Sequence, residues 1–369
     1  MGWFIGLMSG TSLDGVDGVV ARFDSGIHVA AHSHLPFDAR LHELLLALNQ
    51  RGDDELHRAA LAANALAKLY AAAGTDLLRR AALSASDIIA IGAHGQTVRH
   101  RPGEFDGTGY TLQLLNGALL AERSGIDVIC DLRSRDVAAG GQGAPLVPAF
   151  HARCFARPGE DVAVLNLGGI ANLSLLPATG EVTGFDCGPA NALLDLWCRH
   201  HRATAFDDRG AWAAGGTMNA PLLQRMLADP FFDRPPPKST GRDLFNESWL
   251  QRHLATLPAA ALAADVQSTL AELTARSVTA ALLKHAPRTT RLIVCGGGAF
   301  NTHLMSRIAV LLPSVRVGTS AEEGVPPDQV EALAFAWLAH QHVEGLPGNL
   351  QAVTGARGPR VLGARYPAR

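Results

Sequence analysis

The sequence predicts an α/β protein made of two related domains. The chain has 369 residues, which is long for a single hydrophobic core. Segments with apolar residues at helical spacing alternate with short β-branched runs. In addition, a strand–turn–strand pattern with a glycine-rich polar turn occurs at the start of the chain and again near its middle. This weak repeat is what indicates that the two domains are related.

The bulk composition is typical of a soluble protein in a reducing compartment. Hydrophobic residues make up 47% of the chain and charged residues 18%, and the net charge of −2 offers no basic surface for nucleic acid or anionic lipid. The five cysteines form no CxxC pair, which argues against a disulfide framework or a zinc site. No apolar run approaches the ~18 residues of a membrane helix, and no signal-peptide pattern is present. We therefore expect a cytoplasmic protein with neither nucleic acid nor membrane as a partner.

The first hairpin surrounds the sequence SGTSLDGVD, residues 9–17. Its glycines let backbone N–H groups approach an anion closely, and its hydroxyl side chains add donors. Asp14 and Asp17 would repel a bare phosphate but suit one that carries Mg²⁺. An ordinary hairpin with a glycine-containing turn would look the same. The second hairpin of this kind shifts the balance toward phosphate binding.

The first half continues with helices and buried strands. The Ala- and Leu-rich residues 41–83 predict one or two helices with a break at residues 74–75. Residues 88–91 and 126–130 predict two buried strands. Glycine and proline accumulate in residues 131–151, which could contain the boundary between a first and a second domain.

The second half opens with the second hairpin, whose polar turn covers residues 166–172. Helices are predicted at residues 266–285 and from residue 328 to about residue 342, with a strand at residues 292–295. Residues 230–243 contain three consecutive prolines and predict a long loop, because proline fits neither a helix interior nor a central strand.

The sequence lacks the motifs of three common modes of nucleotide binding. It contains no GxxxxGK[ST] motif and only three lysines, so a P-loop is excluded. The Rossmann GxGxxG and the kinase HRD and DFG signatures are also missing. Glycines 296–298 follow a predicted strand and could let a flat ring or a ribose lie against the backbone. A lone run of glycines is, however, more often just a flexible loop.

Two carboxylates are candidates for acid–base chemistry. Asp186 lies between a predicted strand and a helix whose first turn would hold Pro189. We interpret it first as a helix N-cap, with a catalytic carboxylate aimed into a cleft as the alternative. Glu331 lies beside the apolar stripe of the last helix. It could be a solvated edge residue or could point into a site.

Basic residues after two strands are candidates for binding an anion. Arg133 and Arg135 could grip a carboxylate, or could lie in a surface loop with Asp131 and Asp136 as counter-ions. His94, in AHGQT, also follows a strand and could be no more than a turn residue.

Together these motifs resemble the anhydro-N-acetylmuramic acid kinase family. The matching segments are LMSGTSLDGVD, AHGQTVRHRP, DLRSRDVAAGGQGAPLVPAFH, LNLGGIANL, GFDCGPAN, PPPKSTGRD, VCGGGAFN and VEALAFAWLA. They run from residue 7 to about residue 357, and Leu132 replaces the family's Phe. The resemblance implies membership of the sugar kinase, Hsp70 and actin superfamily. That fold has two RNase H-like domains (the actin-like ATPase fold) with a nucleotide cleft between them. The expected domains are residues 1–135 with about 346–369, and residues 136–345.

The resemblance also implies ATP and Mg²⁺ as cofactors and assigns roles to residues. Asp186 would be the catalytic base, Asp14 would lie near Mg²⁺, and Arg133, Glu331 and His94 would bind the sugar. The residues implied for the nucleotide are Gly10, Thr11, Ser12, Leu13, Asp14, Gly15, Val16, Asp17, Asn166, Gly168, Gly169, Gly296, Gly297, Gly298 and Asn301.

The implied reaction opens the 1,6-anhydro ring of anhydro-N-acetylmuramic acid with water and phosphorylates O6 with ATP. The resemblance places this reaction in peptidoglycan recycling and suggests a homodimer. Two alternatives stay open: another sugar or acetate-type kinase of the same superfamily, and an actin- or Hsp70-like ATPase. We expect 369 residues to leave no room for the peptide-binding domain that an Hsp70-like protein needs.

Overall fold

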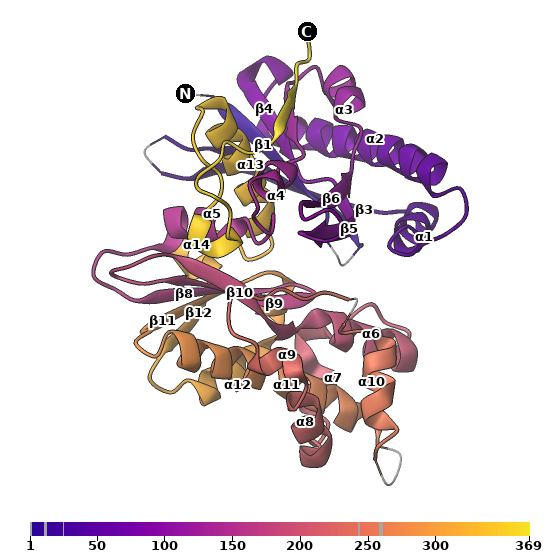
Figure 1. The fold of residues 1–369 in the computed structure, drawn as a ribbon, viewed down its shortest axis with the longest axis vertical. Coiled ribbons are helices and arrows are strands. Elements are labelled where there is room, and N and C mark those ends of the chain that lie inside the picture. Colours follow the sequence, from indigo (N-terminus) through magenta and orange to yellow (C-terminus); the bar gives the residue numbers. More distant parts are fainter. Residues whose placement is uncertain (1, 11–12, 25, 243, 258–260) are drawn as a thin grey trace. The chain divides into compact units, whose positions relative to one another are not determined.

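The structure is a computed structural model with two compact α/β units (Figure 1). It describes residues 2–10, 13–24, 26–242, 244–257 and 261–369. Unit 1 comprises Met1–Phe150 and Gln329–Arg369, and unit 2 comprises His151–Asp328. No helix within the described ranges is long and apolar enough to cross a membrane.

Unit 1 is built on a six-stranded mixed sheet with the order β13-β7-β4-β1-β2-β3, and β5 and β6 form a separate hairpin. The strands are β1 (Trp3–Met8), β2 (Gly15–Arg22), β3 (His28–Pro36), β4 (Ile88–Ala93), β5 (Gln96–Pro102), β6 (Gly109–Leu114), β7 (Val128–Cys130) and β13 (Ala364–Tyr366). The helices are α1 (Ala39–Ala47), α2 (Glu55–Ala81), α3 (Gly117–Ser124), α4 (Ser134–Ala138), α13 (Val330–Val343) and α14 (Gln351–Thr354), with a 3₁₀ turn at Ala85–Asp87. The boundary between the units falls within α5 (Val147–Phe155), whose first four residues belong to unit 1.

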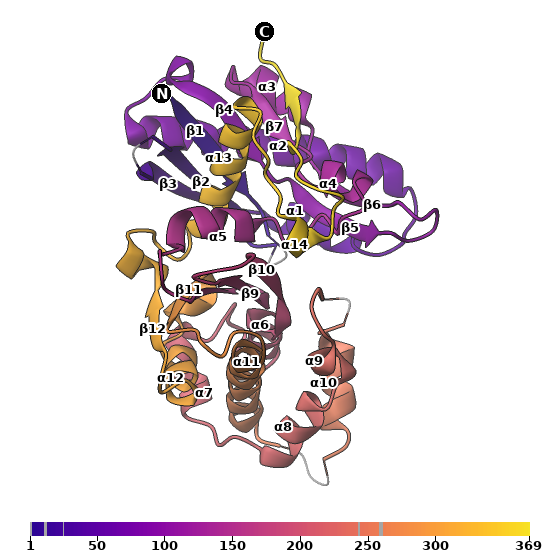
Figure 2. The same ribbon diagram turned by 60° about the vertical axis from the view of Figure 1, so that its left-hand side comes forward.

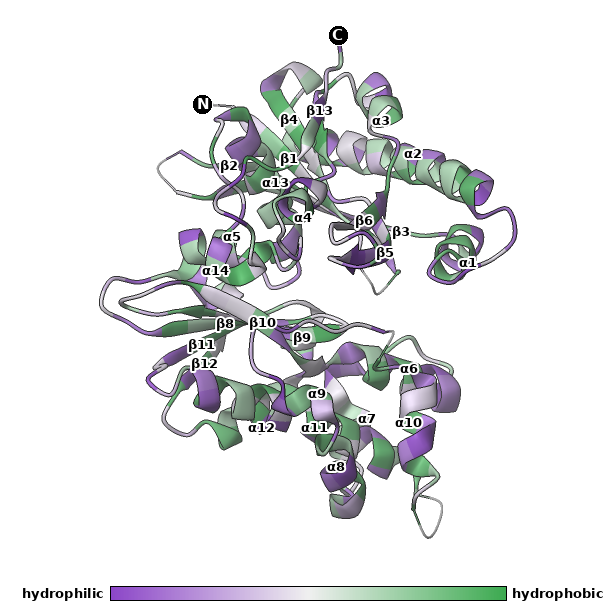
Figure 3. Ribbon diagram, viewed as in Figure 1, coloured by the Kyte–Doolittle hydropathy of each residue, from purple (hydrophilic) through white to green (hydrophobic). Residues whose placement is uncertain are grey.

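Different helices cover the two faces of this sheet. Ile5 and Leu7 of β1 share a hydrophobic core with residues of α2, whose alternating green and purple segments in Figure 3 mark an amphipathic helix. Gly6 lies between them on the opposite face, because successive residues of a strand point to opposite sides. There α13 crosses β1 and β4 (Figure 2). A Cβ atom on Gly6 would lie 1.9 Å from the carbonyl oxygen of Ala332 in α13.

Unit 2 contains a five-stranded sheet with the order β10-β9-β8-β11-β12. Its strands are β8 (Val162–Leu167), β9 (Ile170–Leu176), β10 (Thr183–Pro189), β11 (Arg291–Cys295) and β12 (Arg316–Thr319). Its helices are α6 (Asn191–Arg202), α7 (Ala211–Ala214), α8 (Ala220–Leu227), α9 (Pro230–Asp233), α10 (Glu247–Leu254), α11 (Ala263–His285) and α12 (Thr302–Leu311). Short 3₁₀ turns occur at Asp208–Gly210, Gly297–Phe300 and Ser320–Glu323.

The two units repeat one topology. In each, three consecutive strands form an antiparallel meander: β1-β2-β3 in unit 1 and β8-β9-β10 in unit 2. A fourth strand then pairs in parallel with the first of the three, and a fifth with the fourth. The prediction of two related α/β domains, each with a glycine-tipped hairpin at its start, is confirmed.

Three predictions about the elements were wrong in detail. The helical region breaks between α1 and α2, and α2 runs on through residues 74–75, because Tyr70 and Leu77 on either side are buried in the core of unit 1. The loop predicted at residues 230–243 begins with the short helix α9. The boundary also differs, because residues 136–150 and α13 belong to unit 1, where α13 packs on β1, β2 and β4.

Candidate active site

The turn between β1 and β2 is anchored by side chains of unit 1. The hydroxyl of Ser9 is buried and donates to the carbonyl of Gly95 at 3.1 Å. It therefore accepts the hydrogen of the Tyr70 hydroxyl, 2.8 Å away. Leu13 adopts a left-handed conformation with φ 58°. The predicted nucleotide contacts that lie outside the described residues are Thr11 and Ser12.

The residues after Leu13 divide between the turn and the strand. Asp14 is exposed at the end of the turn. Gly15, Val16 and Asp17 are already part of β2. Val16 is fully buried, and the carboxylate of Asp17 is hydrogen-bonded to Nδ1 of His34 on β3 at 2.8 Å. The structure thus places these three predicted phosphate contacts in the strand, whereas Asp14 remains in the turn.

The turn between β8 and β9 consists of Gly168 and Gly169. The carbonyl of Gly169 accepts hydrogen bonds from the amides of Ala190 and Ala192, both at 3.0 Å. The carbonyl of Gly168 accepts one from the amide of Asn191 at 3.1 Å. The start of α6 therefore holds this second turn in place.

The glycine run after β11 packs directly on the second hairpin. A Cβ on Gly296 would lie 2.4 Å from Oδ1 of Asn166, and one on Gly298 would lie 2.5 Å from Cβ of Leu167. Both glycines are required for close packing within unit 2. Gly297 differs, because its Cβ would meet its nearest neighbour only at 3.9 Å. Of these three glycines, Gly297 is the one whose absent side chain leaves space for a ligand.

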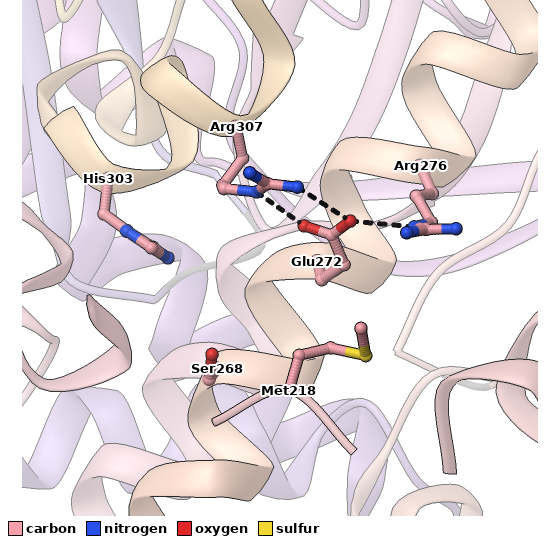
Figure 4. A pocket seen from close by; sticks show the side chains of 6 residues that line it. All are labelled: Met218, Ser268, Glu272, Arg276, His303 and Arg307. Carbon is pink, nitrogen blue, oxygen red and sulfur yellow. Dashed lines mark hydrogen bonds and ion pairs between the residues drawn. The ribbon is translucent and has the colours of Figure 1, made fainter. Parts of the chain in front are cut away.

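A cavity of about 150 Å³ lies beside α12 (Figure 4). It is lined by Met218, Ser268, Glu272, Arg276, His303 and Arg307. Asn301, a predicted nucleotide contact, is the N-cap of α12, because its Oδ1 accepts a hydrogen bond from the amide of Leu304 at 3.0 Å. Burial acts to raise the pKa of Glu272, but the hydrogen bonds from Arg307 and Arg276, both at 2.8 Å, outweigh it and the pKa is lowered. The carboxylate thus stays ionised between two guanidinium groups.

Asp186 is an interior residue of β10, paired with Asn172 of β9. Its Oδ2 accepts a hydrogen bond from the amide of Thr240 at 2.8 Å, which fixes the orientation of the carboxylate. Burial raises the pKa of Asp186 to about 7, although the Thr240 amide and the charge of Lys238 oppose that rise. A carboxylate with this pKa can accept and release a proton near neutral pH.

The interpretation of Asp186 as a helix cap was wrong. The helix begins at Asn191, its N-cap residue is Ala190, and Pro189 ends the strand. The proline-rich segment packs against Asp186 instead, because the backbone N–H of Asp186 donates to the carbonyl of Lys238 at 3.1 Å. A loop more than fifty residues away along the chain therefore forms the immediate surroundings of this carboxylate.

Arg133 and His94 are directly hydrogen-bonded in unit 1. Two guanidinium nitrogens of Arg133 lie 3.1 and 3.0 Å from Nε2 of His94, and a third donates to the carbonyl of Gly143 at 2.8 Å. Burial and the charge of Arg133 lower the pKa of His94 to about 3, so the ring is neutral. Burial lowers the pKa of Arg133 to about 10, while the nearby carboxylate of Glu331 counteracts this shift. The three residues predicted to bind the sugar thus lie together, whereas Arg135 is exposed.

Asp136 has a structural role in the same region. Its buried carboxylate accepts hydrogen bonds from Asn349 at 2.7 Å, Thr354 at 2.8 Å and the amide of Gly143 at 2.7 Å. It ties the glycine-rich segment after Arg133 to the C-terminal part of unit 1. It is not the surface counter-ion that the sequence allowed.

Comparison with known proteins decides the family. The family model described as anhydro-N-acetylmuramic acid kinase matches residues 2–368. The chain belongs to this family. A relative of that name from Variovorax paradoxus is 60% identical and covers 99% of both chains. Relatives of the same name from Cupriavidus metallidurans and Chromobacterium violaceum are 58% and 52% identical, over 99% of this chain and 97% and 99% of theirs.

Among solved structures, the similarity is more distant. The chain aligns with component A of the (R)-2-hydroxyglutaryl-CoA dehydratase of Acidaminococcus fermentans with a TM-score of 0.49 and 12% identity. The alignment covers 91% of this chain and 96% of that one. The family assignment does not rest on this similarity.

Several residues that build the site were not identified from the sequence. Tyr70 holds Ser9 from α2, and Thr240 holds Asp186 from the proline-rich segment. Gln96 donates from its side chain to the carbonyl of Gly10 at 3.0 Å. Gln96 and Thr240 both lie in motifs that carry the family resemblance. Their place in these motifs was the one feature of the sequence that could have identified them.

Proposed function

We propose that this protein is an ATP-dependent kinase that opens the 1,6-anhydro ring of anhydro-N-acetylmuramic acid and phosphorylates O6. The products are N-acetylmuramic acid 6-phosphate and ADP, which places the reaction in peptidoglycan recycling. The observation that carries the proposal is the family match over residues 2–368, together with relatives of that name at 52–60% identity.

Asp186 is proposed as the base that activates water. Its carboxylate takes a proton from a water molecule, whose oxygen attacks C1 of the sugar as the C1–O6 bond breaks. A base is most effective when its pKa is near the working pH, and the pKa of Asp186, about 7, meets this condition. The hydrogen bond from Thr240 supports the proposal because it fixes the carboxylate in one orientation.

The oxygen released from C1 is proposed as the nucleophile for phosphoryl transfer. O6 attacks the γ-phosphorus of ATP, the bond from that phosphorus to the bridging oxygen breaks, and ADP leaves. The phosphoryl group takes up the negative charge that develops on O6, so a strong general acid at O6 is not required. The two glycine turns, 9–14 and 168–169, are the proposed contacts of the phosphates.

Asp14 is the proposed contact of a phosphate-bound Mg²⁺ ion. Such an ion keeps several waters and needs only one or two carboxylates from the protein. Asp14 is exposed at this turn, and the described part of the chain holds no cluster of three or more His, Cys, Asp or Glu residues that could bind a metal. Asp14 would hold the ion directly or through water. When bound, Mg²⁺ neutralises charge on the transferring phosphoryl group.

Arg133 and Glu331 are proposed to bind the sugar. The lactyl carboxylate of the substrate requires a cation, and the guanidinium of Arg133 is partly buried, held by His94 and close to Glu331. Glu331 could accept hydrogen bonds from the hydroxyl or amide groups of the sugar. The exposed Arg135 lacks this surrounding structure and is the weaker candidate.

The cavity beside α12 is proposed as the site of the adenine base. The helix begins at Thr302, separated from the glycine run by residues 299–301, and carries His303 and Arg307 into the cavity (Figure 4). At about 150 Å³ the cavity is smaller than the ~300–1,000 Å³ of a typical ligand pocket, so it could take only part of a nucleotide. The planar guanidinium of Arg307 offers a surface on which a flat base can stack.

The test is to incubate the full chain with Mg-ATP and one sugar at a time, measuring ADP and sugar phosphate by mass spectrometry. We expect phosphorylation of anhydro-N-acetylmuramic acid and little of glucose or N-acetylglucosamine. Phosphorylation of a simple hexose alone would favour the ordinary sugar kinase. ATP hydrolysis that is independent of any sugar would favour an actin- or Hsp70-like ATPase.

A further inference from the structure

A continuous set of hydrogen bonds runs from Arg133 to the first glycine turn inside unit 1. We infer that His94 is a positioning residue that couples sugar binding at Arg133 to nucleotide binding at the Ser9–Gly10 turn. The inference rests on the proposed function, in which Arg133 contacts the sugar and the turn contacts the phosphates. It assigns His94 to the link between the two ligands instead of to direct contact with the sugar.

The hydrogen-bond donors determine the tautomer of His94. A guanidinium can only donate, so Nε2 of His94 must accept from Arg133. The proton of the neutral ring is therefore on Nδ1, which donates to the carbonyl of Ser9 at 3.1 Å. Both ring nitrogens are used inside the protein, and the side chain is buried. A shift of the Arg133 guanidinium therefore changes the hydrogen bond that holds the backbone of Ser9.

The packing around His94 restricts movement of its ring between Arg133 and Ser9. The ring lies against Phe335 of α13, with ring centroids 4.8 Å apart. Glu331 precedes Phe335 by four residues on α13, so both lie on the same side of that helix. Both proposed sugar contacts are therefore connected to the His94 ring. Arg133 is connected by hydrogen bonds, and Glu331 through α13, whose Phe335 packs against the ring.

The turn end of the link is equally fixed. Gln96 donates to the carbonyl of Gly10 at 3.0 Å. The Ser9 hydroxyl is held between Tyr70 and the carbonyl of Gly95. Side chains thus hold both Ser9 and Gly10, the first residues of the turn. A displacement of His94 therefore moves the backbone that is proposed to contact phosphate.

Coupling of this kind must be reciprocal. If bound sugar raises the affinity for nucleotide by some factor, bound nucleotide raises the affinity for sugar by the same factor. We expect a factor of about 5 or more in the wild-type protein, the lower end of the range typical of coupled sites.

The experiment measures this factor by isothermal titration. The full chain is titrated with a non-hydrolysable ATP analogue, with and without saturating anhydro-N-acetylmuramic acid, and then in the reverse order. His94→Asn keeps an N–H near the Nδ1 position but cannot reach Arg133. His94→Gln can reach Arg133 but loses the donor to Ser9. Arg135→Gln, on the exposed neighbour, is the matched control.

In both His94 variants we expect each ligand alone to bind, but the coupling factor to fall to within about twofold of unity. The control should keep the wild-type factor. If His94 had only a structural role, its substitution would lower the affinity for each ligand and leave the coupling factor unchanged. That outcome would overturn the inference. A wild-type protein that binds both ligands without coupling would also overturn it. If wild type binds neither ligand, the proposed function itself fails and this inference fails with it.

Should the His94 variants not fold, Gln96→Leu tests the same link from the turn. It removes the donor to the carbonyl of Gly10 and leaves His94 and Arg133 unchanged. We expect its coupling factor to fall as well, at least by half. An unchanged factor in a folded Gln96→Leu protein would contradict the proposed path.

Discussion

Gly6 of β1 and Gly92 of β4 are register partners, and together they form the surface on which α13 lies. A Cβ on Gly6 would lie 1.9 Å from the carbonyl oxygen of Ala332, and one on Gly92 would lie 2.0 Å from that of Phe335. Because these atoms belong to the helix backbone, neither could move aside without moving the helix. Glu331 is in the first turn of α13, so the two glycines determine where this carboxylate lies.

Gly6→Ala should therefore destabilise unit 1 strongly. We expect a loss of about 3 kcal/mol or more, the upper end for overpacked cores, measured by chemical denaturation. Gly74→Ala is the matched control, because a Cβ there meets nothing within 4 Å in the middle of α2. It should stabilise the protein by roughly 0.5–1 kcal/mol, since alanine is the better helix former. Equal effects of the two substitutions would contradict the close packing of α13.

Gly297→Val should weaken nucleotide binding and leave the fold intact. Its side chain has room within the protein but would occupy space beside the glycine run. We expect the dissociation constant of an ATP analogue to rise about tenfold, which is about 1.4 kcal/mol. Gly298→Val is the comparison, because its Cβ would meet Leu167 at 2.5 Å and should lower the melting temperature. Unchanged affinity in a folded Gly297→Val protein would remove the glycine run from the nucleotide site.

Arg133→Lys should raise the Michaelis constant for the sugar well before it affects that for ATP. Lysine keeps the charge, but its three N–H donors cannot replace the hydrogen bonds to His94 and Gly143 together with a bidentate contact to a carboxylate. Loss of a hydrogen bond between charged groups costs about 1.5–3 kcal/mol, so we expect a rise of roughly 10- to 100-fold. Arg135→Lys, at the exposed neighbour, should change neither constant. Equal effects of the two substitutions would move the sugar carboxylate away from Arg133.

The raised pKa of Asp186 predicts opposite pH dependences for stability and for activity. The folded protein binds the proton more tightly than the unfolded chain does, because the pKa rises from 3.8 to about 7 on folding. The free energy of unfolding should therefore fall as the pH rises through this interval, and level off above it. Asp186→Asn should remove that decline. The turnover number should instead rise with pH and fall roughly tenfold per unit below pH 6, because the base must be ionised.

The local elements were predictable from the sequence because each has a local cause. Both hairpins were predicted from apolar strands around glycine turns, and α11 and β11 from periodicity and β-branched residues. The break predicted at residues 74–75 failed because residues on either side of it, Tyr70 and Leu77, are buried in the core of unit 1, and this packing outweighs the low helix propensity of Gly74.

The parts of the site that depend on distant contacts were not predictable. Asp186 and Thr240 are 54 residues apart, and Ser9 and Tyr70 are 61 apart. No spacing rule connects such pairs, because the loop or helix between them can follow many paths. The same reason explains why α13 was assigned to the wrong domain: its partners Gly6 and Gly92 lie more than two hundred residues earlier in the chain.

The central claim is that Asp186 is the base that activates water at C1. Asp186→Asn preserves the shape of the side chain, and its amide oxygen can still accept from Thr240, but it cannot take up a proton. Asp208→Asn, at a highly exposed carboxylate of unit 2, is the matched control and should behave as wild type.

The most direct measurement runs both variants with anhydro-N-acetylmuramic acid, ATP and ¹⁸O-labelled water, following ¹⁸O at C1 and phosphate at O6 by mass spectrometry. We predict that Asp186→Asn loses both products together, by roughly 10²–10⁴-fold, without a fall in melting temperature, because O6 is not released until water attacks C1. Turnover near the wild-type rate in Asp186→Asn, or phosphorylation at O6 without label at C1, would contradict the account.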